Sequence, residues 1–304
     1  MQVELKENYE IKKHTSFKIG GEVSRVWFPK SQDELVYLLK NLEDYILLGN
    51  CSNILFSSNG YSGNVILTTQ MKNFGIDGTR VVADCGVKGP LLSQKTCEAS
   101  LSGFEFMIGF PGSIGGEIYM NASCHGQCIS DKLIRCCLFD KEKKDIVYKE
   151  KLEMEFDYRK SILQEGKYIL ISAEFELEKA NKEDIQARLD KNLAFRKDKQ
   201  PSLAIPNAGS VFKNPENDSA GRLLDSVGAK TFELDNVKVF EQHANFIVNK
   251  GNASSEDILE LMAKMFTAVK ENYKIELQPE IVFIGDKTEK EENLCKILYP
   301  KTQK

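Results

Sequence analysis

The chain has 304 residues, of which 41% are hydrophobic and 28% are charged, and its formal net charge at pH 7 is −4. This length predicts two or three domains of about 100–150 residues each, and the small negative charge argues against a general nucleic-acid-binding protein. The sequence has no run of about 18 apolar residues, and its first residues lack the apolar core of a secretory signal. We therefore expect a cytoplasmic protein without a membrane span.

The eight cysteines are expected to be reduced thiols, because their spacing fits no disulfide framework. Cys124, His125 and Cys128 are three potential zinc ligands. However, a CxxxC spacing with an adjacent histidine is not a standard zinc motif. We therefore expect no metal site.

The N-terminal part of the chain predicts short strands and two helices. Ser31 and Glu34 form a capping box that begins a helix ending at Asn41. Residues 45–48 predict a short buried strand, which leads into a glycine turn at 49–55. The other elements predicted in this part are an entry strand followed by a glycine turn at 14–21, strands at 64–67 and 79–85 and a helix at 90–99.

The most distinctive segment is a glycine-rich stretch at 103–126, which holds six of the chain's 21 glycines. Glycine has no Cβ, so a cluster of glycines lets backbone N–H groups approach a ligand closely. Ser113, Asn121 and Ser123 add groups that can hydrogen-bond phosphate or a heteroaromatic ring. Apolar residues flank the loop on both sides, whereas a flexible linker would have serines and charges there. We expect a rigid loop that binds a large cofactor.

The part of the chain after this loop predicts a sheet, a charged helix and a last domain. The charged helix at 182–199 is the expected domain boundary. In the last domain, Ser254 and Asp257 cap a long helix with one apolar face, and Asn245 and Asn249 are expected to hold the domain together. The charged tail after the last strand is expected to fray unless its apolar residues dock. The other predicted elements are strands at 133–140, 145–148, 168–177, 209–213, 237–240, 244–248 and 276–285 and a helix at 219–227.

Eight short motifs follow one another along nearly the whole chain. They are HTSFKIGG (14–21), GNCSNILF (49–56), GFPGSIGGEIYMNA (109–122), YRKS (158–161), AGSVFKNP (208–215), AGRLLDSVGAK (220–230), HANFIVN (243–249) and PEIVFIG (279–285). In order and spacing they resemble the UDP-N-acetylenolpyruvoylglucosamine reductase family of bacterial peptidoglycan precursor synthesis, in its shorter subtype. The sequence departs from the family pattern at Phe110, Ser123, Cys124 and His125, which leaves open which side chains contact the flavin ring.

The resemblance implies an α+β protein with a vanillyl-alcohol-oxidase-type FAD-binding fold of two subdomains and a C-terminal α/β substrate-binding domain. We assign these to residues 1–75, 76–185 and 186–290, with a C-terminal tail at 291–304. By the same resemblance, the two glycine loops bind FAD. The residues concerned are Gly49, Asn50, Cys51, Ser52, Asn53, Gly109, Pro111, Gly112, Ser113, Gly115, Gly116, Asn121 and Ala122.

The reaction implied by the resemblance has two halves. NADPH reduces FAD, and the enolpyruvyl group of UDP-N-acetylglucosamine enolpyruvate then receives a hydride at C3 and a proton at C2, which gives UDP-N-acetylmuramate. Ser210 is the candidate proton donor, and Arg159 and Glu280 are the candidate groups that bind the substrate carboxylate. The further candidate substrate-binding residues are Tyr158, Lys199 and Asn214.

These residues also have structural explanations. Ser210 and Glu280 fit strand-edge positions, and Arg159 fits a surface ion pair. Two other functions stay open: an oxidase with the flavin attached through His14 or His125, and a non-catalytic flavin- or nucleotide-sensing module. No protein partner is inferred. The candidates for the substrate diphosphate, which fit a solvated helix face equally well, are Arg196, Lys199 and Arg222.

Overall fold

The computed structural model describes residues 2–202 and 204–300, and the chain forms two compact units made of non-contiguous segments. Unit 1 comprises Met1–Lys6, Arg25–Asn50 and Gly63–Arg196, and unit 2 comprises Glu7–Ser24, Cys51–Ser62 and Lys197–Lys304. Segments from the N-terminal part of the sequence therefore belong to the same unit as its C-terminal third. The division into three domains stays a prediction.

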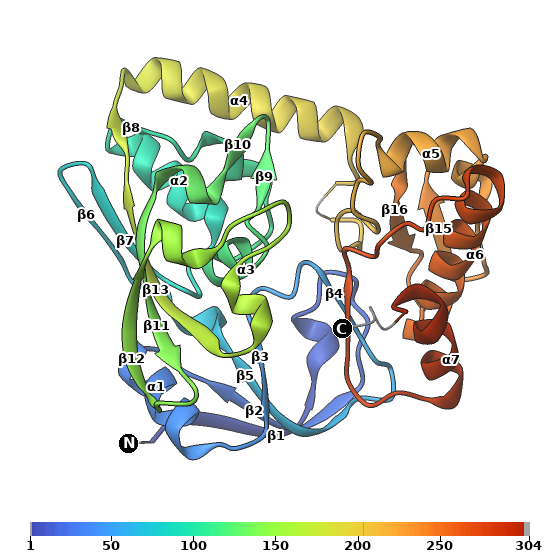
Figure 1. Ribbon diagram of the computed structural model, residues 1–304, viewed down its shortest axis with the longest axis horizontal. Helices are drawn as coiled ribbons and strands as arrows, with labels where there is room; N and C mark the ends of the chain where they lie inside the picture. The colour runs from blue at the N-terminus through green and yellow to red at the C-terminus, as the bar shows by residue number, and fades with distance from the viewer. Residues whose placement is uncertain (1, 203, 301–304) are drawn as a thin grey trace. The chain divides into compact units, whose positions relative to one another are not determined.

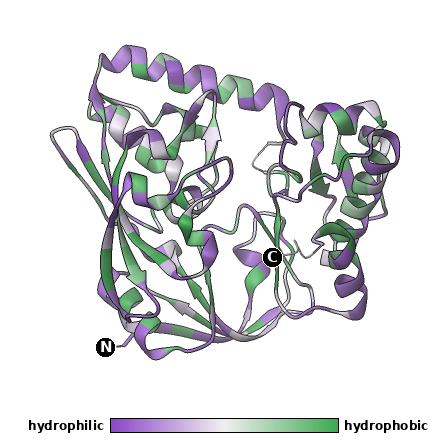
Figure 2. Cartoon of the chain, viewed as in Figure 1, coloured by the Kyte–Doolittle hydropathy of each residue, from purple (hydrophilic) through white to green (hydrophobic). Residues whose placement is uncertain are grey.

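A five-stranded antiparallel sheet forms the centre of unit 1, in the order β12-β11-β13-β7-β6 (Figure 1). Its strands are β6 (Phe74–Asp77), β7 (Arg80–Asp84), β11 (Leu133–Asp140), β12 (Asp145–Glu150) and β13 (Tyr168–Glu176). Strands β11 and β13 are largely hydrophobic and mostly buried (Figure 2). Continuous apolar runs of this kind are typical of strands covered on both faces, and the strands predicted at 133–140, 145–148 and 168–177 are confirmed.

A second sheet has the order β1-β2-β5-β3. Its strands are β1 (Glu4–Glu10), β2 (Glu22–Phe28), β3 (Tyr45–Leu48) and β5 (Tyr61–Leu67), of which β3 and β5 are parallel. The entry strand predicted within 14–21 is wrong. Lys18 and Gly20 have φ angles of +59° and +145°, which strands do not adopt, so this segment is a series of turns.

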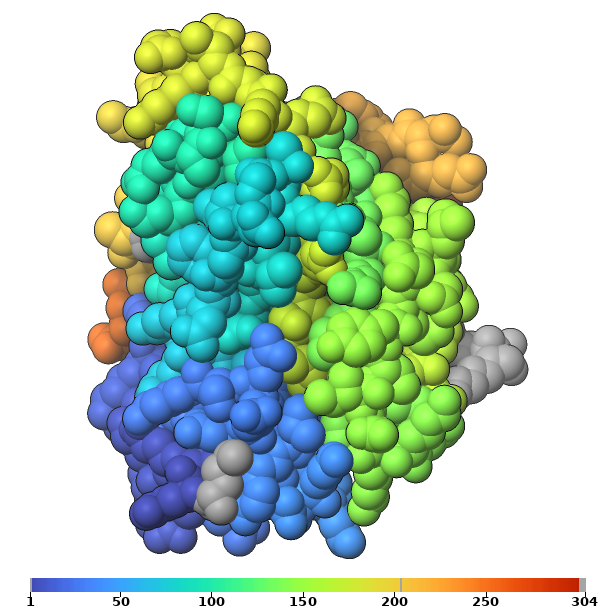
Figure 3. Space-filling model, turned by 90° about the vertical axis from the view of Figure 1, so that its left-hand side faces the viewer, coloured from blue at the N-terminus to red at the C-terminus, as the bar shows by residue number. Residues whose placement is uncertain are grey.

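Helix α1 (Gln32–Asn41) begins where the sequence predicts, because the Ser31 hydroxyl accepts a hydrogen bond from the Glu34 N–H (3.2 Å). The other α-helices of unit 1 are α2 (Gly89–Glu98), α3 (Ile114–Tyr119) and α4 (Lys182–Lys199), whose last three residues are assigned to unit 2. Helix α4 stands out at the top of the unit in Figure 3. The short elements are η2 (Thr68–Gln70), η3 (Glu105–Gly109), η4 (Ile129–Lys132), η5 (Lys151–Met154), η6 (Ile162–Glu165), β8 (Leu101–Ser102), β9 (Ser123–Cys124), β10 (Gln127–Cys128) and β14 (Glu178–Lys179).

Unit 2 contains two pairs of strands. Its elements are η1 (Ile11–Lys13), β4 (Ile54–Phe56), α5 (Ala220–Ser226), η7 (Ala229–Thr231), β15 (Val237–Phe240), β16 (His243–Asn249), α6 (Ser255–Tyr273), β17 (Val282–Ile284) and α7 (Glu289–Leu298). Strands β15 and β16 are antiparallel, whereas β17 pairs in parallel with β4. The predicted strand at 209–213 is wrong, because only Phe212 forms a bridge there, with Pro279. Gly209 turns the chain just before it, with a φ angle of +76°.

The C-terminal tail docks on unit 2 over residues 289–298. The prediction that its apolar residues could dock is therefore confirmed for this part of the tail. Cys295 and Leu298 of α7 are buried in the core of unit 2. The buried carboxylate of Glu291 accepts hydrogen bonds from the hydroxyls of Ser57 (3.0 Å) and Ser255. Residues 301–304 lie outside the described part of the chain. No described helix is both long and apolar enough to cross a lipid bilayer.

Candidate functional site

The start of the first glycine loop, Gly49 and Asn50, meets the second loop within unit 1. The side-chain amide of Asn50 donates a hydrogen bond to the carbonyl of Pro111. A Cβ atom on Gly49 would overlap the hydroxyl of Ser113 where it now lies, so glycine lets the first loop approach the second closely without moving that side chain. The structure therefore brings together two segments that lie about sixty residues apart in sequence.

The second loop packs tightly on the connection between β7 and α2. Gly115 donates its N–H to the carbonyl of Cys85 (2.8 Å), and Ile114 donates to the carbonyl of Val87 (2.8 Å). A Cβ on Gly115 would lie 3.0 Å from the Cys85 carbonyl oxygen, which is tighter than most Cβ contacts in proteins. The glycines at these positions fix the loop against the protein and support the prediction of a rigid loop.

Three side chains at this loop contain buried polar atoms with no hydrogen-bond partner among the described residues. These atoms are the Ser113 hydroxyl, the Asn121 side-chain carbonyl and both carboxyl oxygens of Glu117. A buried polar group without a partner costs about 1–3 kcal/mol. Such a cluster points to a ligand that supplies the missing hydrogen bonds, and a hydroxyl and an amide suit a phosphate or a flavin ring.

The turn with Arg159 is fastened to the same loop. Asn121 donates its side-chain N–H to the carbonyl of Asp157 (3.1 Å), and Arg159 donates to the hydroxyl of Ser123 (2.8 Å). The Arg159 guanidinium also lies over the ring of Tyr158 at 5.1 Å, and Tyr158 is 49% exposed. Arg159 and Tyr158 therefore lie beside the loop that we expect to bind the cofactor.

Ser210 and Glu280 belong to two adjacent segments of unit 2. The N–H of Glu280 donates to the carbonyl of Val211 (2.8 Å), and the N–H of Lys213 donates to the carbonyl of Gln278 (2.8 Å). The two segments therefore run antiparallel. Val211, which accepts the hydrogen bond from the Glu280 backbone, is the residue directly after Ser210. Of the three proposed catalytic residues, these two share one unit and Arg159 belongs to the other.

Asparagine side chains hold both segments in place. Asn245 accepts from the Phe212 N–H (3.0 Å) and donates to the Phe212 carbonyl (2.8 Å), as a neighbouring strand would do. Asn249 donates to a backbone carbonyl of the same unit. The prediction that these two residues hold the domain together is confirmed. The segment with Glu280 is also held by Asn53 of the first glycine loop, which donates its side-chain N–H to the Glu280 carbonyl (3.0 Å).

Comparison with known proteins covers most of the chain. A model of the FAD binding domain matches residues 23–139, and a model of the UDP-N-acetylenolpyruvoylglucosamine reductase C-terminal domain matches residues 200–284. The reductase of Caldicellulosiruptor bescii is 40% identical over 93% of this chain and 92% of its own length. The chain belongs to the UDP-N-acetylenolpyruvoylglucosamine reductase family.

Other members of the reductase family agree. The Bacillus licheniformis protein is 37% identical over 92% of this chain and 94% of its own length. The crystal structure of the Thermus caldophilus enzyme superposes with a TM-score of 0.79 and 32% identity, over 93% of this chain and 99% of that one. The predicted fold class, a vanillyl-alcohol-oxidase-type FAD-binding fold with a C-terminal α/β domain, is confirmed, and the protein is an FAD-dependent oxidoreductase.

Of the three candidates for the substrate diphosphate, Arg196 belongs to the same unit as the second glycine loop and contacts it. Its side chain lies so close to Gly109 that a Cβ on that glycine would be 2.9 Å from the arginine Cδ. None of the described residues forms an ion pair with Arg196, and burial lowers the pKa of its guanidinium. Lys199 is exposed and pairs with its neighbour in sequence, and Arg222 makes two bonds to Asp218.

Asn214 was predicted to contact the substrate and Cys51 to contact FAD, but both side chains lie against the protein itself. The side-chain carbonyl of Asn214 accepts from the N–H of Ala220 (3.0 Å) at the start of α5. Cys51 is buried, and burial raises the pKa of its thiol to about 12. The Cys51 thiol is therefore neutral at pH 7, and its backbone is the part suited to contact FAD.

The histidines and cysteines of the loops form no metal site in the described part of the chain, where no group of three or more potential ligands is close enough. His125 instead packs edge to face on Phe195 of α4, with ring centroids 5.2 Å apart. His14 is hydrogen-bonded to the Tyr9 hydroxyl (2.9 Å) in unit 2.

Glu117 is the residue of this site that sequence reasoning missed. It is 3% exposed, and its carboxyl lies where side chains on Gly89 and Gly112 would otherwise project. Burial raises the pKa of this carboxyl to about 8, so it is neutral at pH 7. The signal in the sequence was a single acidic residue inside the otherwise uncharged segment IGGEIY.

Proposed function

We propose that this protein catalyses the NADPH-dependent, FAD-mediated reduction of the enolpyruvyl group of UDP-N-acetylglucosamine enolpyruvate to UDP-N-acetylmuramate, a step of peptidoglycan precursor synthesis. The observation that carries the proposal is the antiparallel pairing of the Ser210 and Glu280 segments, in which the Glu280 N–H binds the Val211 carbonyl. This pairing supports the joint action of a proton donor and a carboxylate-binding group on one substrate. The names of the relatives support the identity of that substrate.

The two glycine loops fit FAD. The Gly49 and Gly112 backbones, the Ser113 hydroxyl and the Asn121 amide would hold it, because they combine close backbone approach with buried polar atoms that need partners. When bound, FAD supplies hydride transfer, which no amino-acid side chain provides. The protein's part is to bind and orient the reactants and to exclude water.

Ser210 is proposed to give the proton that C2 of the enolpyruvyl group needs after a hydride has reached C3. Negative charge then develops at C2 and in the adjoining carboxylate. The guanidinium of Arg159 would bind that carboxylate through two parallel N–H groups. Glu280 would share a proton with it, which requires burial or the nearby substrate charge to raise the pKa of its carboxyl. Tyr158, Lys199 and Asn214 stay proposed substrate contacts.

Arg159→Lys is expected to lower turnover about tenfold to a hundredfold, because lysine keeps the positive charge but loses the planar pair of donors. The reduction of FAD by NADPH is expected to be unchanged. Steady-state rates and single-turnover rates of both halves check this prediction. Near-normal turnover would remove Arg159 from the mechanism.

Anaerobic stopped-flow absorbance tests the proposal as a whole. NADPH is expected to bleach the yellow protein, and the enolpyruvyl sugar nucleotide is expected to restore the colour. Bleaching without recovery would favour a flavin-sensing module. Acid precipitation addresses the remaining alternative, since flavin that stays in the pellet would indicate covalent attachment through His14 or His125 and would favour an oxidase.

A further inference from the structure

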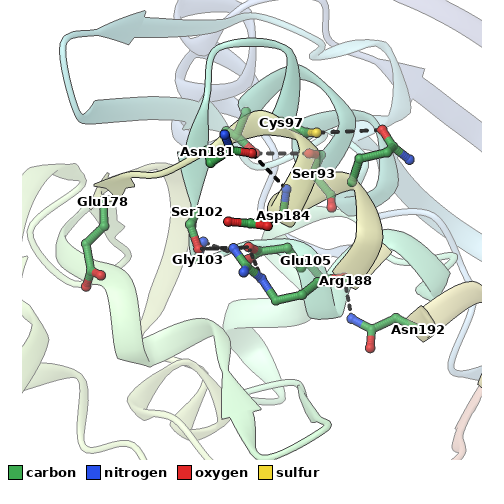
Figure 4. Close-up of polar contacts among 12 residues, drawn as sticks. Ser93, Cys97, Ser102, Gly103, Glu105, Glu178, Asn181, Asp184, Arg188 and Asn192 are labelled. Atoms are coloured by element: carbon green, nitrogen blue, oxygen red, sulfur yellow. Dashed lines mark hydrogen bonds and ion pairs between the residues drawn. The ribbon is translucent and has the colours of Figure 1, made fainter. Parts of the chain in front are cut away.

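A buried carboxylate anchors helix α4 to the segment that leads into the second glycine loop (Figure 4). Glu105 accepts hydrogen bonds from the Ser102 hydroxyl (2.8 Å), the Gly103 N–H (2.7 Å) and two N–H groups of Arg188 (3.0 and 2.8 Å). The Glu105 side chain is 4% exposed. Burial raises the pKa of this carboxyl, but the four hydrogen bonds lower it by more, so it is ionised at pH 7.

Glu105 is the first residue of η3, which ends at Gly109 of the loop. Its backbone is held by the same helix as its side chain, because Asn192 of α4 donates to the Glu105 carbonyl (2.9 Å). Figure 4 shows Arg188 and Asn192 approaching Glu105 from α4. Helix α4 is therefore fastened to the start of the loop through both the side chain and the backbone of Glu105.

The same face of α4 reaches the loop itself. Residues 188, 192 and 196 are four apart, so their side chains lie one above the other on a helix. Arg196, the last of them, packs against Gly109. Helix α4 is mostly hydrophilic (Figure 2) and buries only Ile185 and Leu189 as apolar side chains. These two side chains pack with Cys97 and Ile108, and the polar contacts of Arg188 and Asn192 fasten the helix to Glu105 as well.

We infer that Glu105 and Arg188 are positioning residues of the FAD site, which fix α4 so that the Arg196 guanidinium lies at the cofactor loop. The inference rests on the proposed FAD site. A cation held in a half-buried position stabilises the negative charges of a bound dinucleotide more strongly than a cation in water. Its alignment therefore controls how tightly FAD is held and how easily the flavin accepts electrons.

A double-mutant cycle tests the inference. FAD dissociation constants, measured by flavin fluorescence, and flavin midpoint potentials are compared in Arg196→Gln, Arg188→Leu and the double variant. We expect Arg196→Gln to weaken FAD binding about tenfold, the effect of losing one charge-assisted contact, and to lower the potential. Arg188→Leu is also expected to weaken FAD binding and to lower the midpoint potential. The double variant is expected to bind FAD no more weakly than Arg196→Gln alone.

The matched control is Arg80→Leu, which breaks another ion pair of unit 1 between an exposed arginine and a mostly buried glutamate, Glu174 (3.1 Å). It is expected to leave both quantities unchanged. Additive effects in the cycle, or equal values in Arg188→Leu and Arg80→Leu, would overturn the inference. If Arg188→Leu does not fold, Glu105→Gln takes its place in the cycle. A wild-type protein that binds no FAD would overturn the proposed function instead.

Discussion

Ser210→Ala is expected to accept electrons from NADPH at the normal rate and to lose the ability to pass them to the enolpyruvyl substrate. General acid catalysis contributes about 10²–10⁴ in rate, and we expect a loss of that size in the oxidative half-reaction only. The hydroxyl can have this effect because its segment is held on both sides, by Asn245 and by the segment with Glu280. Single-turnover absorbance of the pre-reduced protein measures the loss directly.

The matched control for this variant is Ser226→Ala. This serine also belongs to unit 2, but its hydroxyl donates to the Leu223 carbonyl of α5 (2.7 Å), and both half-reactions are expected to survive its removal. An oxidative half-reaction of Ser210→Ala as fast as that of the control would show that another group delivers the proton.

Elements that local sequence determines were predicted well. The bounds of β3, β11 and α4 agree with the predictions at 45–48, 133–140 and 182–199. Apolar runs, caps and charged helical faces act within a few residues of the chain. Their signal does not depend on what the rest of the molecule does.

Elements that distant partners determine were not predicted. Strands were predicted within 14–21 and at 209–213. Positive φ angles at Lys18 and Gly20 turn the first segment, and the second pairs with the Glu280 segment only around the bridge between Phe212 and Pro279. Pairing of β4 with β17 joins residues more than two hundred positions apart. No local pattern specifies such a pairing, because the hydrogen bonds of an edge are the same whichever strand supplies them.

The candidate site was also predicted only in those parts that have a local signal in the sequence. The glycine loops were predicted from composition, because glycine spacing is visible in the sequence. The roles proposed for Ser210, Arg159 and Glu280 came from the resemblance, since each residue alone fits an ordinary structural position. Contacts such as Arg159 with Ser123 and Asn245 with Phe212 required the structure.

Glu117→Gln is expected to stabilise the protein at neutral pH and to have little effect in acid. Burial raises the pKa of this carboxyl from 4.5 to about 8 in the folded protein. Between these values the unfolded chain releases the proton and the folded chain keeps it, so the free energy of unfolding falls as pH rises, by about 1.4 kcal/mol per pH unit. At pH 7 the accumulated penalty is about 3 kcal/mol, and glutamine avoids it because it does not ionise.

Urea unfolding of the FAD-saturated protein at pH 5, 6, 7 and 8 measures this difference. The stability gain of Glu117→Gln is expected to grow across the series and to level off above about pH 8, where the folded protein also ionises. Glu98→Gln on α2 is the control, because Glu98 is an exposed glutamate paired with Lys95, and removing an exposed ion pair is expected to have a small effect on stability. A gain that stays constant with pH, or a loss of stability at pH 7, would mean that the Glu117 carboxylate is ionised and stabilised by partners, and the case for a neutral acid beside the cofactor loop would fail.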